Sequence, residues 1–152
     1  MVGPDDEEFE TFFRDTEPRL RPALFAALGA ERGREATAEA FAWAWETWPK
    51  SQQLENPIGY LFRVGQSKTR RKRFRLVLVT LSTEDPIVEP GLGAALSQLS
   101  DSQRIAVVLV HGFGWTLREV AELRAIRVTS VQTHVERGLK RLRAALGVTE
   151  NA

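Results

Sequence analysis

The chain has 152 residues, of which 43% are hydrophobic and 27% charged, as in a globular protein of one domain or two small ones. It contains no cysteine, which excludes disulfides, thiolate metal sites and a cysteine nucleophile. Twenty-one basic and 20 acidic residues give a net charge of +1, which at first sight argues against a nucleic-acid partner. No apolar run is long enough to cross a membrane and no secretory signal is present, so we expect a cytoplasmic protein without membrane insertion.

The charged residues are segregated along the chain, so the total charge conceals their distribution. Residues 5–17 contain seven acids against Arg14 alone, and residues 63–75 contain seven basic residues and no acid. Residues 124–143 contain six basic residues against Glu136 alone. A solvated face explains one such block, but two basic blocks attached to helical patterns favour contact with a polyanion.

Apolar residues spaced three and four apart predict a first helix over residues 9–28. We expect a break or kink near Pro18 and Pro22, because proline removes a helical hydrogen bond, and an end at Gly29. A second helix is predicted over residues 34–48, followed by a polar loop over residues 49–56.

The second helix has two different faces. One stripe is predicted to be core and consists of Thr37, Phe41, Ala44, Trp45 and Trp48. The other stripe points away from it and carries Glu35, Glu39, Trp43 and Glu46. An outward tryptophan among carboxylates indicates a protein interface, unless the first helix covers Trp43.

A third helix is predicted to open at Asn56, a good N-cap, with Pro57 at the first helical position. It runs into a basic block that cannot be buried unpaired, and contact with DNA phosphates is its natural use. The candidate DNA-binding residues of this block are Lys68, Arg70, Arg71, Lys72, Arg73 and Arg75. A solubilising helix tail is the alternative.

Residues 76–81 form an apolar run whose period distinguishes neither strand nor helix, and residues 82–91 are rich in proline and glycine. We therefore predict an all-α protein with two small helical domains, residues 1–81 and 92–152, joined by a linker over residues 82–91.

A helix-turn-helix is predicted in the second domain. Thr116 and Glu119 have the spacing of a capping box, Ala125–Arg127 would form the turn, and a long amphipathic helix follows with Val131 and Val135 on its apolar stripe. Polar and basic side chains on such a helix can read base edges and contact phosphates, although an ordinary surface helix has similar residues. The candidate DNA-binding residues are Ser130, Gln132, Thr133, His134, Glu136, Arg137, Lys140 and Arg141.

Residues 95–146 resemble the promoter-recognition domain, region 4, of bacterial extracytoplasmic-function sigma factors of the sigma-70 family. The matching stretches are residues 95–104, residues 117–123, Ile126 and residues 131–142. The resemblance implies that this domain reads the −35 promoter element, with residues 132–134, Glu136 and Arg137 facing DNA. The chain departs from the family at Ala125, where glycine is usual, and at Arg127, where serine is usual.

Residues 35–45 resemble the region 2 helix with which this family grips the coiled coil of the polymerase β′ subunit. The resemblance implies that Glu35, Glu39, Trp43 and Glu46 bind core RNA polymerase. Residues 56–64 resemble the opening of the helix that melts and binds the −10 element.

The order of these motifs predicts a transcription initiation sigma factor that binds core RNA polymerase and promoter DNA. It would catalyse nothing and need no metal or cofactor, and the resemblance allows for an anti-sigma partner. The alternative is a sigma-like regulator or polymerase accessory factor that has lost promoter melting. Two departures motivate this alternative: Ala38 replaces the usual glutamine, and the family's usual continuation is absent after Val64.

Overall fold

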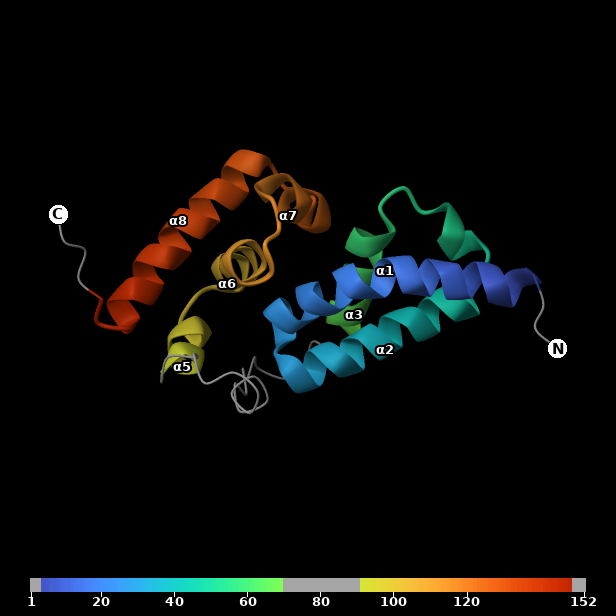
Figure 1. Cartoon of the computed structure of the whole chain (residues 1–152), viewed down its shortest axis with the longest axis horizontal. Coiled ribbons are helices and arrows are strands. Elements are labelled where there is room, and N and C mark those ends of the chain that lie inside the picture. Colours follow the sequence, from blue (N-terminus) through green and yellow to red (C-terminus); the bar gives the residue numbers. More distant parts are fainter. Residues whose placement is uncertain (1–3, 70–90, 149–152) are drawn as a thin grey trace.

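The computed structural model describes residues 4–69 and 91–148, and both segments are helical throughout their regular structure (Figure 1). The prediction of an all-α protein is confirmed in these segments. The helices are α1 (Pro4–Leu28), α2 (Ala30–Glu46), the 3-10 helix η1 (Lys50–Gln53), α3 (Pro57–Lys68), α5 (Leu92–Ser97), α6 (Asp101–Val107), the π-helix η2 (Val108–Gly112), α7 (Leu117–Arg124) and α8 (Val128–Ala145). The apolar run 76–81 and all but the last residue of the linker lie outside the described residues.

Helix α1 continues through Pro18 and Pro22, so of the expected break or kink the break does not occur. Each proline lacks the N–H that would bond to the carbonyl four residues earlier. Tertiary packing compensates for this loss, because the C-terminal half of α1 carries five core residues that are at most 5% exposed: Leu20, Ala23, Leu24, Ala26 and Ala27. Burial of one face therefore determines the length of this helix.

Gly29 alone separates α1 from α2, and its φ of 89° lies in the region that glycine adopts readily. The predicted end of the first helix at Gly29 is confirmed, but α2 begins at Ala30, four residues earlier than expected. The two helices cross closely at Gly33, where an added Cβ would lie 2.9 Å from the Cα of Phe25. This crossing orients α2 on α1.

The predicted start of α3 is confirmed in detail. Asn56 is the N-cap, its Oδ1 accepts a hydrogen bond from the Gly59 amide at 3.1 Å, and Pro57 occupies the first turn. The Asn56 side chain also donates from Nδ2 to the carbonyl of Glu122 in α7 at 2.8 Å. The cap of α3 therefore also joins the N-terminal helices to α7.

The helix-turn-helix forms as predicted. Both bonds of the capping box are present at the start of α7, with Thr116 and Glu119 each accepting from the other's backbone amide at 3.1 Å. Ala125 ends α7 with a φ of 56°, the left-handed conformation for which glycine is the usual residue. Arg127 precedes α8 without a side-chain cap, as its residue type leads us to expect.

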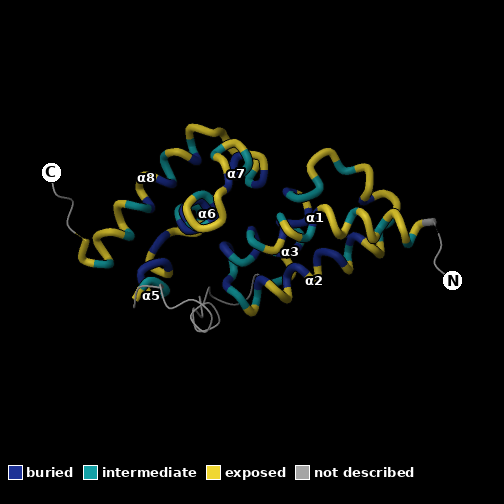
Figure 2. The backbone as a smooth tube through the Cα atoms, viewed as in Figure 1, coloured by how far each residue is buried: buried dark blue, intermediate teal, exposed yellow. Residues whose placement is uncertain are grey.

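The N-terminal and C-terminal helices pack against each other and share one apolar core (Figure 2). Helix α1 contacts α6 and η2, and α3 contacts α7. The shared core joins Leu24 and Phe62 of the N-terminal helical group (α1 to α3) to Ile105 and Leu109 of the C-terminal helical group (α5 to α8). Each of these side chains is at most 1% exposed. The N-terminal and C-terminal helices are therefore docked across an apolar interface.

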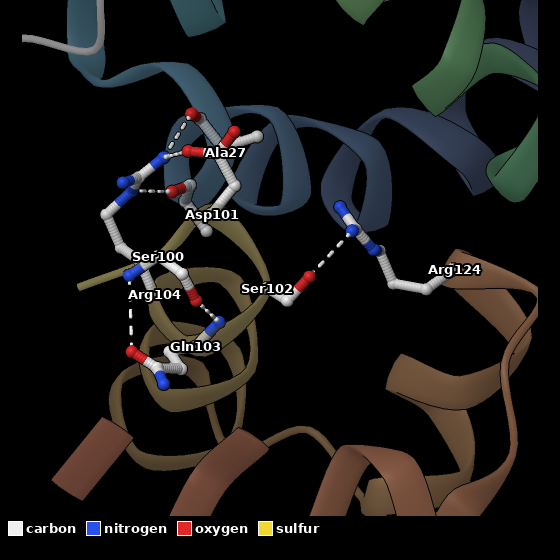
Figure 3. A network of polar contacts seen from close by, with 8 residues as sticks. Ala27, Ser100, Asp101, Ser102, Gln103, Arg104 and Arg124 are labelled. Carbon is white, nitrogen blue, oxygen red and sulfur yellow. Dashed lines mark hydrogen bonds and ion pairs between the residues drawn. The ribbon is translucent and has the colours of Figure 1, made fainter. Parts of the chain in front are cut away.

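A buried arginine lies at this interface (Figure 3). The side chain of Arg104 is 3% exposed, and it donates from Nε to the Ala26 carbonyl at 3.1 Å and from Nη2 to the Ala27 carbonyl at 2.9 Å. Nη2 also lies 2.9 Å from Asp101. Burial lowers the pKa of Arg104, and the hydrogen bond and charge of Asp101 oppose that shift. Helix α1 has no basic residue in its own last turn, so Arg104 supplies the cation there.

Candidate nucleic-acid and partner interfaces

Helix α8 is held rigidly on its inner side. Val131, Val135 and Gly138 are buried, and α8 packs against both α6 and α7. An added Cβ at Gly138 would lie 2.6 Å from Cγ2 of Val107, so α6 and α8 approach more closely at this point than a larger residue would allow. The opposite face of α8 is turned to solvent along most of its length (Figure 2).

The eight candidate DNA-binding residues of α8 differ in exposure. Gln132, Glu136, Arg137, Lys140 and Arg141 are exposed, whereas Ser130, Thr133 and His134 are half-buried. Arg137 and Lys140 have no hydrogen-bond or ion-pair partner among the described residues and are available to a phosphate or base. Arg141 is partly occupied, because its Nη1 donates to Oε1 of Gln103 in α6 at 3.3 Å.

The first two turns of α8 contain two exposed residues that our sequence analysis missed. Val128 is 41% exposed at the first helical position, and Thr129 follows it. Thr129 lies four residues before Thr133, and the Thr133 hydroxyl donates to its carbonyl at 3.1 Å. Extending the polar face back by one turn would have identified Thr129, whereas an exposed valine has no comparable signal in the sequence.

The second basic block is described only at its start. Lys68 is exposed in the last turn of α3, and Arg70, Arg71, Lys72, Arg73 and Arg75 lie outside the described residues. Of the nearby aromatic residues, Phe62 is 1% exposed and belongs to the core, whereas Tyr60 is 38% exposed. The Arg63 guanidinium lies 5.8 Å from the centre of the Tyr60 ring.

The outward face of α2 is acidic. Glu35, Glu39 and Glu46 are exposed and make no hydrogen bond or ion pair with the described residues. The two tryptophans have the reverse of their expected environments. Trp45 is 48% exposed, whereas Trp43 is half-buried with its ring centre 5.1 Å from that of Tyr60 in α3.

The packing of α2 between two helices explains this correction. Its buried residues are Gly33, Ala36, Thr37, Ala40, Phe41 and Ala44, a stripe that faces α1 and α3 together. Trp43 lies on the α3 side of this stripe, and Trp45 lies on the α1 side, where its ring centre is 4.9 Å from that of Phe9. Trp45 also lines an open groove together with Asp6, Phe9, Glu10 and Phe13.

Metal sites and membrane spans are both absent from the described segments. Residues 4–69 and 91–148 contain no group of three or more histidine, aspartate or glutamate side chains placed to hold a metal ion. None of the helices in those segments combines the length and apolarity needed to cross a bilayer.

Comparison with known protein families gives a match in the C-terminal part of the chain. The sequence profile of the family described as "Sigma-70, region 4" matches residues 91–142, in the part of the chain where the sequence analysis found the resemblance to region 4. The match includes α7, the turn and most of α8. None of the curated proteins compared with the chain is significantly similar to it.

Two solved structures share the fold of this chain. The sigma factor RpoE of Bartonella quintana, solved with the anti-sigma factor NepR, has a TM-score of 0.63 at 18% identity, over 95% of this chain and 99% of that one. CnrH, solved with the cytosolic domain of CnrY, has a TM-score of 0.66 at 18% identity, over 97% of this chain and 92% of that one. At this identity the likeness establishes the fold alone.

Proposed function

We propose that this chain, whose residues 91–142 are a sigma-70 region 4 domain, is a sigma factor that binds core RNA polymerase and directs it to specific promoters. The observation that carries the proposal is α8 itself. A family-matched helix-turn-helix holds this helix from its inner side and leaves Gln132, Glu136 and Arg137 exposed. A major groove accepts an α-helix in this presentation.

The polymerase contact is proposed on the outward face of α2. Glu35, Glu39 and Glu46 give this face an unpaired negative charge that suits a basic partner surface. Trp43 borders the face with its partly exposed ring. Trp45 extends the face towards the groove beside α1, and a large exposed aromatic ring is a typical energetic centre of a protein interface.

The basic block that begins at Lys68 is proposed to meet promoter DNA near the start site. Arg70, Arg71, Lys72, Arg73 and Arg75 would contribute phosphate contacts, whose strength falls with rising salt. The sigma factor RpoE of this fold was solved with the anti-sigma factor NepR, and CnrH of this fold was solved with the cytosolic domain of CnrY. We propose that this chain also has an anti-sigma partner in the cytoplasm. We assign it no catalytic role.

Run-off transcription with core polymerase tests the proposal. The purified chain should comigrate with core enzyme and support initiation at a subset of genomic promoters. A variant with Glu35→Lys and Glu39→Lys should lose both activities yet keep its affinity for the same DNA, because those side chains lie on α2 and not on α8. DNA binding by the unaltered chain without transcripts would favour the accessory regulator. A chain that neither comigrates nor initiates contradicts the proposal.

A further inference from the structure

Glu136 is the only acidic residue of α8. Thr129, Gln132 and Glu136 are exposed within about two turns of the helix, and basic side chains follow at Arg137 and Lys140. An exposed carboxylate is unusual in this position, because DNA phosphates repel it. If α8 lies in a major groove, the carboxylate of Glu136 therefore needs a compensating contact with the DNA.

Two side-chain hydrogen bonds lie within this face. One N–H of the Gln132 amide donates to the Glu136 carboxylate, with 3.5 Å between Nε2 and Oε1, and the other N–H and the carbonyl oxygen make no hydrogen bond with the described residues. The Thr133 hydroxyl donates to the helix backbone. The contact from Gln132 also restrains the Glu136 side chain, which makes Gln132 a positioning residue.

The four bases differ in what they offer such a surface. In the major groove cytosine presents an amino donor and no acceptor, whereas guanine and thymine present acceptors to an approaching side chain. Adenine presents a donor beside an acceptor. A carboxylate has no proton to give, so it satisfies cytosine fully, satisfies adenine in part and is repelled by guanine and thymine.

We propose that Glu136 selects a cytosine in the upstream promoter element by accepting a hydrogen bond from its exocyclic amino group. This inference rests on the proposed function, since it requires α8 to lie in the major groove. The repulsion between Glu136 and phosphates then contributes to specificity. It weakens binding at every site that lacks the cytosine and is offset only where the amino donor is present.

Selection from a randomised duplex library by the full chain tests this assignment. The full chain is suitable because Gln132, Glu136 and Arg137 are exposed in the docked arrangement. The selected element should contain a cytosine that binds about tenfold to a hundredfold better than any substitute at that position. In the variant Glu136→Gln the preferred base there should change to adenine, which pairs with an amide in bidentate fashion.

A charge-matched control separates base selection from simple electrostatics. Glu122 is another exposed carboxylate of the same domain, and its backbone faces the N-terminal helices through Asn56. Glu122→Gln and Glu136→Gln each remove one negative charge. Glu122→Gln should nevertheless leave the selected element unchanged. The variant Gln132→Ala should weaken the cytosine preference without replacing it by another base, since Gln132 acts through Glu136.

The outcomes that overturn the proposal are specific. A selected element without a discriminating cytosine refutes it, as does a Glu136→Gln variant that selects the same element as the unaltered chain with an unchanged melting temperature. If the unaltered chain selects no sequence at all, the proposed DNA binding fails together with this inference. Base discrimination that persists in Glu136→Gln but is lost in Gln132→Ala would transfer the readout to Gln132.

Discussion

Replacement of Arg104 by methionine tests how the two helical groups are joined. Methionine fills most of the buried volume but cannot donate to the carbonyls of Ala26 and Ala27. A hydrogen bond from a charged donor contributes about 1.5–3 kcal/mol, so two such bonds are worth about 3–6 kcal/mol. Relief of the desolvation that lowers the pKa of Arg104 returns part of this. We therefore expect the free energy of unfolding to fall by about 2–4 kcal/mol.

The ion pair with Asp101 should contribute much less than the carbonyl contacts. The Asp101 side chain is 79% exposed, and such pairs are typically worth less than about 1 kcal/mol. Urea unfolding, followed by the circular dichroism of the helices, compares Arg104→Met and Asp101→Asn with the unaltered chain. The reasoning is refuted if Arg104→Met remains within about 0.5 kcal/mol of the unaltered chain. It is also refuted if Asp101→Asn is as costly as Arg104→Met, since the exposed ion pair would then dominate.

Three further predictions concern the other surfaces. Trp45→Ala should weaken core polymerase binding at least about tenfold in a titration and hardly change the melting temperature. Trp43→Ala, which removes the ring packed against Tyr60, should chiefly lower the melting temperature. Equal effects of the two variants on binding and on melting temperature would contradict this division. Replacing Arg70, Arg71, Lys72 and Arg73 by alanine should reduce the slope of log affinity for DNA against log salt by up to about 0.9 per lost phosphate contact, and an unchanged slope rejects the phosphate role. Gly138→Ala should lower the free energy of unfolding in urea by about 1–3 kcal/mol, because the added Cβ meets Val107. Gly112→Ala is the control and should change it little, since its added Cβ has no neighbour nearer than 3.8 Å. Similar unfolding midpoints for the two variants would refute the close packing of α6 and α8.

Features fixed by neighbouring residues could be predicted from the sequence. The N-cap at Asn56 and the capping box from Thr116 to Glu119 form as expected, because each involves atoms only three residues apart. The same holds for the helical class of both segments and for the end of α1 at Gly29, which follow from periodicity and backbone freedom. The family resemblance located region 4 in the part of the chain where residues 91–142 match its profile.

Features fixed by distant residues could not be predicted. Pro18 and Pro22 indicate a break locally, but α1 continues because its C-terminal half is buried by other helices. The environments of Trp43 and Trp45 depend on which helix lies on each side of α2, which a helical stripe alone does not specify. Arg104 binds backbone carbonyls 77 and 78 residues away, and a carbonyl has no side chain by which a sequence could reveal it.

The residues that dock the two helical groups are separate from those proposed to bind DNA and polymerase. Docking uses Arg104 with the end of α1, Asn56 with α7, and Arg19, which pairs with Glu119 and lies 4.5 Å from the centre of the Trp115 ring. The proposed sites use the outward faces of α2 and α8, which stay exposed in the docked state. Substitutions at sites that share no partner usually act additively, so docking, polymerase binding and base selection can be altered one at a time. A net charge of +1 is compatible with all three, because the acidic face of α2 and the basic residues of α8 lie in different helical groups of the fold.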